Sequence, residues 1–167
     1  MAFAGIGVDM LEIGRMRSAI ERHPHIVERT FTDAERAYCD RTARPAQHYA
    51  ARFAAREAVL KALGTGFSQG IGLKDVSVEV DEAGRPRAVL AGRAAEVARE
   101  LGVQEVALSL SYTHDVALAN AVAVTQEVRP KTEKKTDPGL RSFREARSVV
   151  EELERAQAQL GGLSDGE

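Results

Sequence analysis

Residues 52–66 of this 167-residue chain read RFAAREAVLKALGTG and carry most of the information on its fold. The alanines favour helix and leave little bulk, so another backbone can approach closely. Two glycines then supply a helix stop and a loop with permissive dihedrals. Glu57 and Lys61, four residues apart, are neighbours on one helix face. They form either an ordinary salt bridge or a pair suited to phosphate chemistry, the carboxylate holding a metal and the ammonium a phosphate.

Composition excludes several classes of function. The net charge of −2 gives no indication of nucleic-acid binding or of binding to a membrane surface. The single cysteine, Cys39, rules out an intrachain disulfide framework and a cysteine-based zinc site. The start of the chain lacks the pattern of a signal peptide, and the longest apolar stretch, 116–124, is too short to span a bilayer. We therefore expect a soluble cytoplasmic domain.

The first half of the sequence predicts helices after one short strand. Thr32 and Glu35 have the spacing of a capping box, with Phe31 placed as the hydrophobic staple. Apolar residues at helical spacing define the other helices. The elements expected here are a strand over 3–8 that ends at Asp9 and helices over 11–22, 32–38 and 47–63.

The second half changes character, because apolar and polar residues now alternate as in strands with one buried face. The elements expected here are strands over 76–80, 87–91, 106–110 and 116–124, and a helix over 93–101. Since helices come first and antiparallel hairpins later, the fold class is α+β rather than doubly wound α/β.

The last part of the chain differs in composition from the rest. The composition shifts from residue 126, and 129–139 are charged, bracketed by prolines and nearly free of apolar side chains, which predicts a disordered linker over 126–139. Apolar residues recur at helical spacing over 140–160, which predicts an amphipathic helix docked on the domain or on another copy, and 161–167 should fray. We thus expect a domain over 1–125, a charged linker over 126–139 and a C-terminal helix with a frayed end over 140–167.

Two further residues are candidates for chemistry. Asp9 follows a glycine-rich strand and is either a ligand for a hard cation such as Mg²⁺ or a helix N-cap. With Glu57 it would make a magnesium site if the fold brings the two carboxylates together. His114 lies in a polar turn, where it either serves a phosphate or a proton transfer or simply faces solvent.

Four short motifs occur along the chain in a particular order. They are GIGVD at 5–9 with Glu12 just beyond, RFAAREA at 52–58 with Lys61 and the GTG of 64–66, Gly84-Arg85-Pro86, and SLSYTH at 109–114. Together they resemble the holo-acyl-carrier-protein synthases, the small trimeric 4′-phosphopantetheinyl transferases. The resemblance covers residues 3 to about 124 and leaves the tail unexplained.

The resemblance implies the fold of that family, an antiparallel sheet with a long central helix, here extended by a C-terminal helix. It also implies transfer of 4′-phosphopantetheine from coenzyme A to a serine of apo acyl carrier protein, with release of adenosine 3′,5′-bisphosphate. By this analogy Asp9 and Glu57 hold Mg²⁺ and Lys61 contacts the pyrophosphate. The serine proton goes to a metal-bound water or to a side chain nearby, and His114 becomes a candidate if its imidazole lies close to Asp115. The catalytic set so implied is Asp9, Glu57, Lys61 and His114.

The resemblance further implies where coenzyme A and the carrier protein bind. Arg52 and His114 would grip the 3′-phosphate, and the turn at 84–86 would border the adenine. The coenzyme-binding set so implied is Arg44, Arg52, Lys61, Gly64, Gly84, Arg85, Pro86 and His114. In this family the sites lie between subunits of a homotrimer. Arg15 and Arg22 match positions that face the acidic helix of the carrier protein, or else form a solvated helix face.

A second hypothesis is a non-catalytic homologue that binds carrier protein or coenzyme A. The residues of the metal pair argue against it, because a pure binding module does not need them. The sequence leaves open whether the carrier protein serves fatty-acid or polyketide synthesis.

Overall fold

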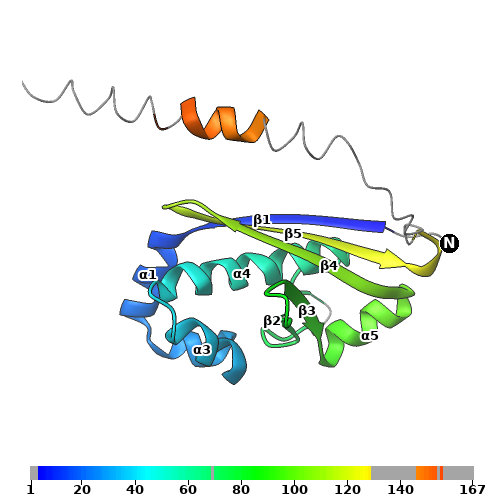
Figure 1. Ribbon diagram of the computed structural model, residues 1–167. Helices are drawn as coiled ribbons and strands as arrows, with labels where there is room; N and C mark the ends of the chain where they lie inside the picture. Colours follow the sequence, from blue (N-terminus) through cyan, green and yellow to red (C-terminus); the bar gives the residue numbers. More distant parts are fainter. Residues whose placement is uncertain (1–3, 69, 129–145, 154, 156–167) are drawn as a thin grey trace, which may run out of the picture. The chain divides into compact units, whose positions relative to one another are not determined.

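One long helix, α4 (Pro45–Ala62), lies along a three-stranded antiparallel sheet in the computed structural model, which describes residues 4–68, 70–128, 146–153 and 155 (Figure 1). The strand order in this sheet is β1-β5-β4, and β2 and β3 form a separate hairpin. In chain order the elements are β1 (Ala4–Glu12), α1 (Ile13–Arg22), α2 (His25–Thr30), α3 (Asp33–Asp40), α4, β2 (Val76–Val80), β3 (Pro86–Leu90), α5 (Gly92–Glu100), β4 (Val103–Tyr112), β5 (Val116–Thr125) and a 3-10 turn η1 (Gln126–Val128).

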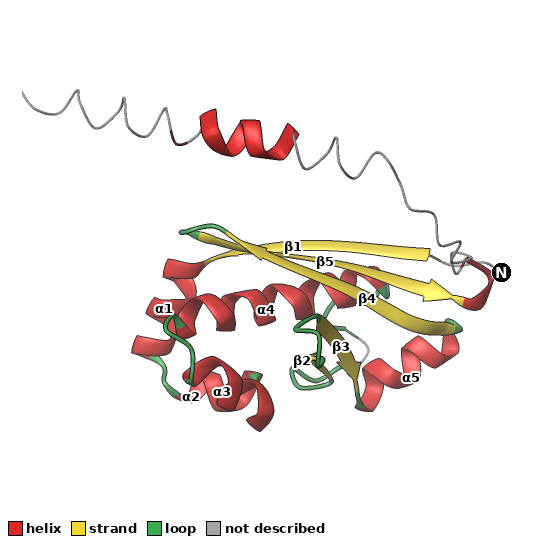
Figure 2. Ribbon diagram, in the orientation of Figure 1, coloured by secondary structure: helices red, strands yellow, loops and turns green. Residues whose placement is uncertain are grey.

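The layers of the domain follow from this order. Figure 2 shows helices α1 to α5 and the β2–β3 hairpin on the same side of the three-stranded sheet. The α+β fold predicted from the sequence is confirmed, and so is the long central helix. Within the described part of 4–128, no helix covers the opposite face of the sheet.

Several predicted boundaries are wrong. The first strand does not end at Asp9 but continues to Glu12, because β1 is paired with β5 along its whole length, up to Glu12 opposite Val116. Asp9 therefore lies within a strand, which excludes the helix N-cap interpretation, and α1 begins at Ile13. The sequence also failed to predict α2, a six-residue helix too short to show a period. Strands β4 and β5 are longer than expected, since a hairpin ladder extends pairing beyond the apolar core of each strand.

The capping box at the start of α3 is confirmed. Thr32 accepts from the Glu35 backbone N–H at 3.3 Å, and Glu35 accepts from the Thr32 backbone N–H at 3.0 Å. Glu35 also accepts from the Val78 N–H at 2.9 Å, and its other partner is the guanidinium of Arg56. Both side chains of this ion pair are fully buried, so removal of one partner should cost about 3–5 kcal/mol. The pair ties α3, α4 and β2 together.

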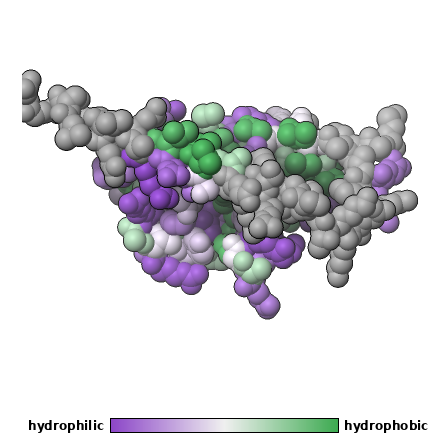
Figure 3. Space-filling model, turned by 45° about the horizontal axis from the view of Figure 1, so that its top comes forward, coloured by the Kyte–Doolittle hydropathy of each residue, from purple (hydrophilic) through white to green (hydrophobic). Residues whose placement is uncertain are grey.

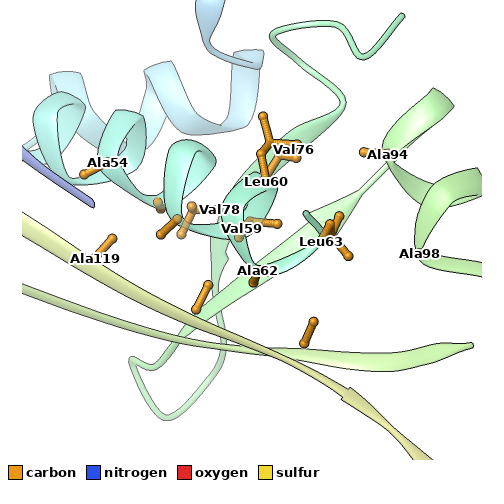
Figure 4. Packing of buried hydrophobic residues seen from close by; sticks show 14 of the residues in the cluster. Ala54, Val59, Leu60, Ala62, Leu63, Val76, Val78, Ala94, Ala98 and Ala119 are labelled. Carbon is orange, nitrogen blue, oxygen red and sulfur yellow. The ribbon is translucent and has the colours of Figure 1, made fainter. Parts of the chain in front are cut away.

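The core between α4 and the sheet is built largely from alanine. Ala54, Ala58 and Ala62 of α4 are buried, and so are the alanines that β5 turns inward, among them Ala119 (Figure 4). Small side chains on both surfaces let the backbones approach closely. The approach is tightest at Gly7 of β1, where a Cβ atom would lie 1.8 Å from the carbonyl oxygen of Ala58.

The C-terminal unit, Pro130–Glu167, is separate from the unit Met1–Arg129. Residues 146–153 and 155 are helical, as predicted, and the rest of the predicted helix and residues 129–139 of the predicted linker lie outside the described residues. The apolar side chains Val149, Val150 and Leu153 are exposed. None of the helices described is both long and apolar enough to cross a membrane.

We predict that Gly7→Ala lowers the free energy of unfolding by about 3 kcal/mol or more, because the added methyl group must displace the α4 backbone. Denaturant unfolding followed by circular dichroism measures this. Gly14→Ala is the matched control, since its Cβ meets nothing within 4 Å and alanine favours the helix. Equal stability of the two variants would contradict the packing argument.

Candidate active site

The close approach of β1 to α4 brings two predicted site residues together. The Lys61 ammonium donates to Asp9 Oδ1 at 2.8 Å and to the Val8 carbonyl at 3.1 Å. Among the described residues, Glu57 makes no ion pair within 4.0 Å, so the Glu57–Lys61 salt bridge considered from spacing does not form. Lys61 pairs instead across the interface between helix and strand.

Glu57 lies near enough to Asp9 and Lys61 for both of their charges to act on its carboxylate. Burial raises the pKa of Glu57, the negative charge of Asp9 raises it further, and Lys61 opposes both effects. The hydrogen bond to Asp9 raises the pKa of Lys61. Two carboxylates that repel each other lie beside a single ammonium, which pairs with Asp9 alone. The group therefore carries an excess of negative charge. A cation would relieve that excess.

The donor set suits one kind of cation. Within the described ranges, no group of three or more histidine, cysteine, aspartate or glutamate side chains is placed to hold a metal ion. The two carboxylates of Asp9 and Glu57 suit Mg²⁺, an ion commonly held by one or two carboxylates, waters and substrate phosphates.

A second group of predicted residues lines a cavity of about 170 Å³ beside α4. Arg52, Gly84 and Pro86 contribute to it. The Arg52 guanidinium is buried, lies 4.0 Å from the centre of the Tyr38 ring, and leaves its Nε without a hydrogen-bond partner. A buried donor without a partner is costly and suits an anionic ligand that would accept from it.

Aromatic residues that the sequence analysis did not assign to the site also line this cavity. Tyr38, His48 and Tyr112 lie in a row, with ring centroids 5.6 Å and 5.9 Å apart and nearly perpendicular planes. Burial lowers the pKa of His48, and the charge of Arg52 lowers it further. These residues lie on α3, α4 and β4, so no sequence pattern could have indicated that they meet.

Asp81 holds the turn at 84–86 in place, and the sequence analysis did not single it out either. Its Oδ1 accepts from the backbone N–H groups of Ala83 and Arg85, each at 2.9 Å, and its Oδ2 accepts from Arg85 Nε at 3.0 Å. These bonds lower the pKa of Asp81, the Arg85 backbone donor most. Gly84 takes a positive φ of 79° in this turn, and the Arg85 side chain points largely into solvent.

Arg44 and His114 line a third region, a pocket of about 320 Å³ at the start of α4. The imidazole Nδ1 of His114 lies 2.7 Å from Asp115 Oδ1, so the contact considered from sequence is formed, on side chains that are both largely exposed. His114 and Arg52 line different cavities. Arg52, Gly84 and Pro86 therefore line a different cavity from Arg44 and His114, and Lys61 lies apart from both groups at Asp9.

The remaining predicted residues occupy the ends of helices. Gly64 follows α4 with a φ of 74° and so ends the helix as expected. Arg15 and Arg22 are exposed on α1, while Ile13 and Met16 of that helix face the core.

Known proteins of similar sequence indicate the family of this chain. Residues 5–121 match the model of the 4′-phosphopantetheinyl transferase superfamily. The chain is 48% identical over 120 residues to the holo-[acyl-carrier-protein] synthase of Moorella thermoacetica, covering 72% of this chain and 91% of that protein. It is 49% identical over 121 residues to that of Desulforudis audaxviator, covering 72% and 92% respectively.

Solved structures show the same fold. The holo-[acyl-carrier-protein] synthase of Neisseria meningitidis superposes with a TM-score of 0.66 at 29% identity, covering 71% of this chain and 96% of that one. That of Bacillus anthracis, solved with CoA (3′,5′-ADP), has a TM-score of 0.62 at 28% identity, covering 75% and 100%. The chain therefore belongs to the 4′-phosphopantetheinyl transferase superfamily. Within it, the similarity is to the holo-[acyl-carrier-protein] synthases, and the C-terminal helix lies beyond the matched domain.

We predict that Glu57→Gln raises the melting temperature at pH 7 in the presence of EDTA. A carboxyl whose folded pKa is raised is destabilising once ionised, so a neutral side chain is favoured above that pKa. The gain should shrink as the pH falls towards 4.5, the ordinary pKa of glutamate, where Glu57 becomes protonated. Thermal unfolding at several pH values measures this gain in melting temperature, and Glu82→Gln, in an exposed turn, is the control. A lower melting temperature for Glu57→Gln at pH 7 would contradict this account.

Proposed function

We propose that this chain transfers the 4′-phosphopantetheine group of coenzyme A to a serine hydroxyl of apo acyl carrier protein. The observation that carries the proposal is the group formed by Asp9, Glu57 and Lys61 in a chain of this family. The serine oxygen forms a bond to the phosphorus that bears pantetheine. The bond from that phosphorus to adenosine 3′,5′-bisphosphate breaks.

Asp9 and Glu57 hold Mg²⁺ in this proposal. When bound, the metal supplies charge neutralisation at the phosphoryl oxygens. Lys61 lies on the same face of α4 as Glu57 and adds a positive charge where charge develops in the transition state. The alanine packing of α4 against β1 holds these groups in place, so little reorganisation is needed during the reaction.

Arg52 binds the 3′-phosphate of the coenzyme. Its unpartnered Nε and its burial beside Tyr38 support this role, because a phosphate oxygen would accept from the orphaned donor. The turn at 84–86, held by Asp81, lies at the same cavity and borders the adenine. Arg44 and His114 belong to the coenzyme site of a neighbouring subunit, which accounts for their separation from Arg52 within one chain.

A homotrimer requires a surface that binds further copies, and the uncovered face of the three-stranded sheet offers one. Ile6, Val8 and Met10 of β1 are exposed there, at 72%, 45% and 63%, and stand opposite Val122, Asn120 and Leu118 of β5. Figure 3, in which this face comes forward, shows apolar residues gathered on it. An apolar patch of this kind on a folded protein marks an interaction surface. We assign it to the subunit contact of the trimer.

Arg15 and Arg22 on α1 face the acidic helix of the carrier protein. Both are exposed, and neither makes an ion pair with another described residue of the chain. Complementary charge would orient the carrier protein towards the catalytic group.

The proposed transfer can be measured directly by intact-mass spectrometry of the carrier protein. Apo acyl carrier protein incubated with this chain, coenzyme A and Mg²⁺ should gain the mass of phosphopantetheine, and EDTA should abolish the gain. Glu57→Gln should slow the transfer roughly a hundredfold or more, because it removes a metal ligand, whereas Glu82→Gln should not.

Two results would contradict the proposal in different ways. A folded wild-type chain that adds no mass to several carrier proteins but still binds them would indicate a non-catalytic binding module. Near-normal transfer by Glu57→Gln would refute the metal-ligand role alone.

The sheet face makes a prediction for assembly. Ile6→Asp should convert the trimer to monomer in sedimentation velocity, since a charge at the subunit contact must be buried without a partner. Circular dichroism should remain that of the folded chain, because Ile6 contributes to the outer face and not to the core. Glu82→Lys changes charge at an exposed turn and should leave the trimer intact. A trimeric Ile6→Asp variant would exclude this face as the contact.

A further inference from the structure

Lys61 occupies one of the two carboxylate oxygens that Asp9 could offer to a metal ion. Its ammonium lies 2.8 Å from Asp9 Oδ1 and 3.1 Å from the Val8 carbonyl, and both atoms are oxygen ligands of the kind that hard cations take. An ammonium held on Asp9 neutralises part of the carboxylate charge and repels a second cation, so a divalent cation binds there less tightly while Lys61 stays in place. The two cations therefore compete.

The described neighbours of Lys61 leave half of its side chain open to solvent, so the ammonium is free to leave Asp9. The Lys61 side chain is 50% exposed, whereas that of Asp9 is 20% exposed. A lysine stem is flexible, and its ammonium is a compact charge that can move between neighbouring oxygen atoms. A pyrophosphate beside Glu57 and Asp9 would offer a stronger negative partner than one carboxylate.

We propose that Lys61 blocks the metal site in the nucleotide-free enzyme and leaves Asp9 for the pyrophosphate when coenzyme A binds. This inference rests on the metal site of the proposed function. It follows that the metal alone binds weakly, and that metal and coenzyme A each strengthen the binding of the other. Lys61 thus couples the two ligands, so that the metal site fills when the substrate is present.

Titration of the full-length chain with Mn²⁺, followed by electron paramagnetic resonance of the free ion, tests this directly. Mn²⁺ prefers the same oxygen ligands as Mg²⁺. Without nucleotide, Lys61→Met should bind Mn²⁺ about three- to tenfold more tightly than the wild type, the range expected for loss of a partly exposed charged hydrogen bond. Lys74→Met, at an exposed loop position, is the matched control and should bind like the wild type.

A second titration with saturating coenzyme A separates competition at Asp9 from a general effect of charge. Competition predicts that coenzyme A tightens Mn²⁺ binding by a larger factor in the wild type than in Lys61→Met, after correction for Mn²⁺ bound to free coenzyme A. A general effect of charge would shift the affinity equally with and without coenzyme A, and the two factors would be the same. Equal factors, or Mn²⁺ binding by Lys61→Met no tighter than by the wild type, would overturn the inference.

The Glu57→Gln variant distinguishes failure of the metal site from failure of the blocking role of Lys61. If it abolishes Mn²⁺ binding while Lys61→Met leaves the affinity unchanged, the metal site stands and the blocking role of Lys61 is wrong. If Mn²⁺ binding never depends on Glu57, even with coenzyme A, the metal site of the proposed function fails and the inference fails with it.

Discussion

The contact between Gly7 of β1 and the backbone of Ala58 in α4 is the constraint on which the rest of the structure depends. No other residue type fits at Gly7, since a Cβ would lie 1.8 Å from a carbonyl oxygen. This contact sets the distance between strand and helix. Asp9 lies two residues after Gly7, and Glu57 and Lys61 flank Ala58 on α4. The same close approach that packs the core therefore brings the charged groups of the site together.

Stability and chemistry place opposite demands on α4. Its alanines and the buried Arg56–Glu35 pair hold the helix against the sheet and the neighbouring elements. Glu57, in contrast, is held where its ionised form is disfavoured by burial and by Asp9, and Arg52 is buried with an unpaired donor. Such groups cost free energy, which a cation bound at Glu57 or an anion bound at Arg52 would offset.

One chain presents its candidate functional groups in separate regions. Asp9, Glu57 and Lys61 lie at the β1–α4 contact, Arg52 lies in the aromatic cavity, and Arg44 and His114 lie at the start of α4. The apolar sheet face that no helix of the described part of 4–128 covers accompanies this division. Both features have the same explanation if further copies of the chain pack on that face and complete each site. Catalysis would then require assembly.

The sequence by itself determined the α+β class, the long helix (predicted over 47–63 and found over 45–62), the capping box at Thr32 and the family. Each of these rests on short local patterns and on the order of those patterns along the chain. The sequence could not determine that β1 continues past Asp9, since that length is set by pairing with β5 far along the chain. Only the tertiary structure decided that Lys61 pairs with Asp9 and not with Glu57, and that Tyr38, His48 and Tyr112 meet beside Arg52. Such contacts join residues distant in sequence, and local spacing carries no information on them.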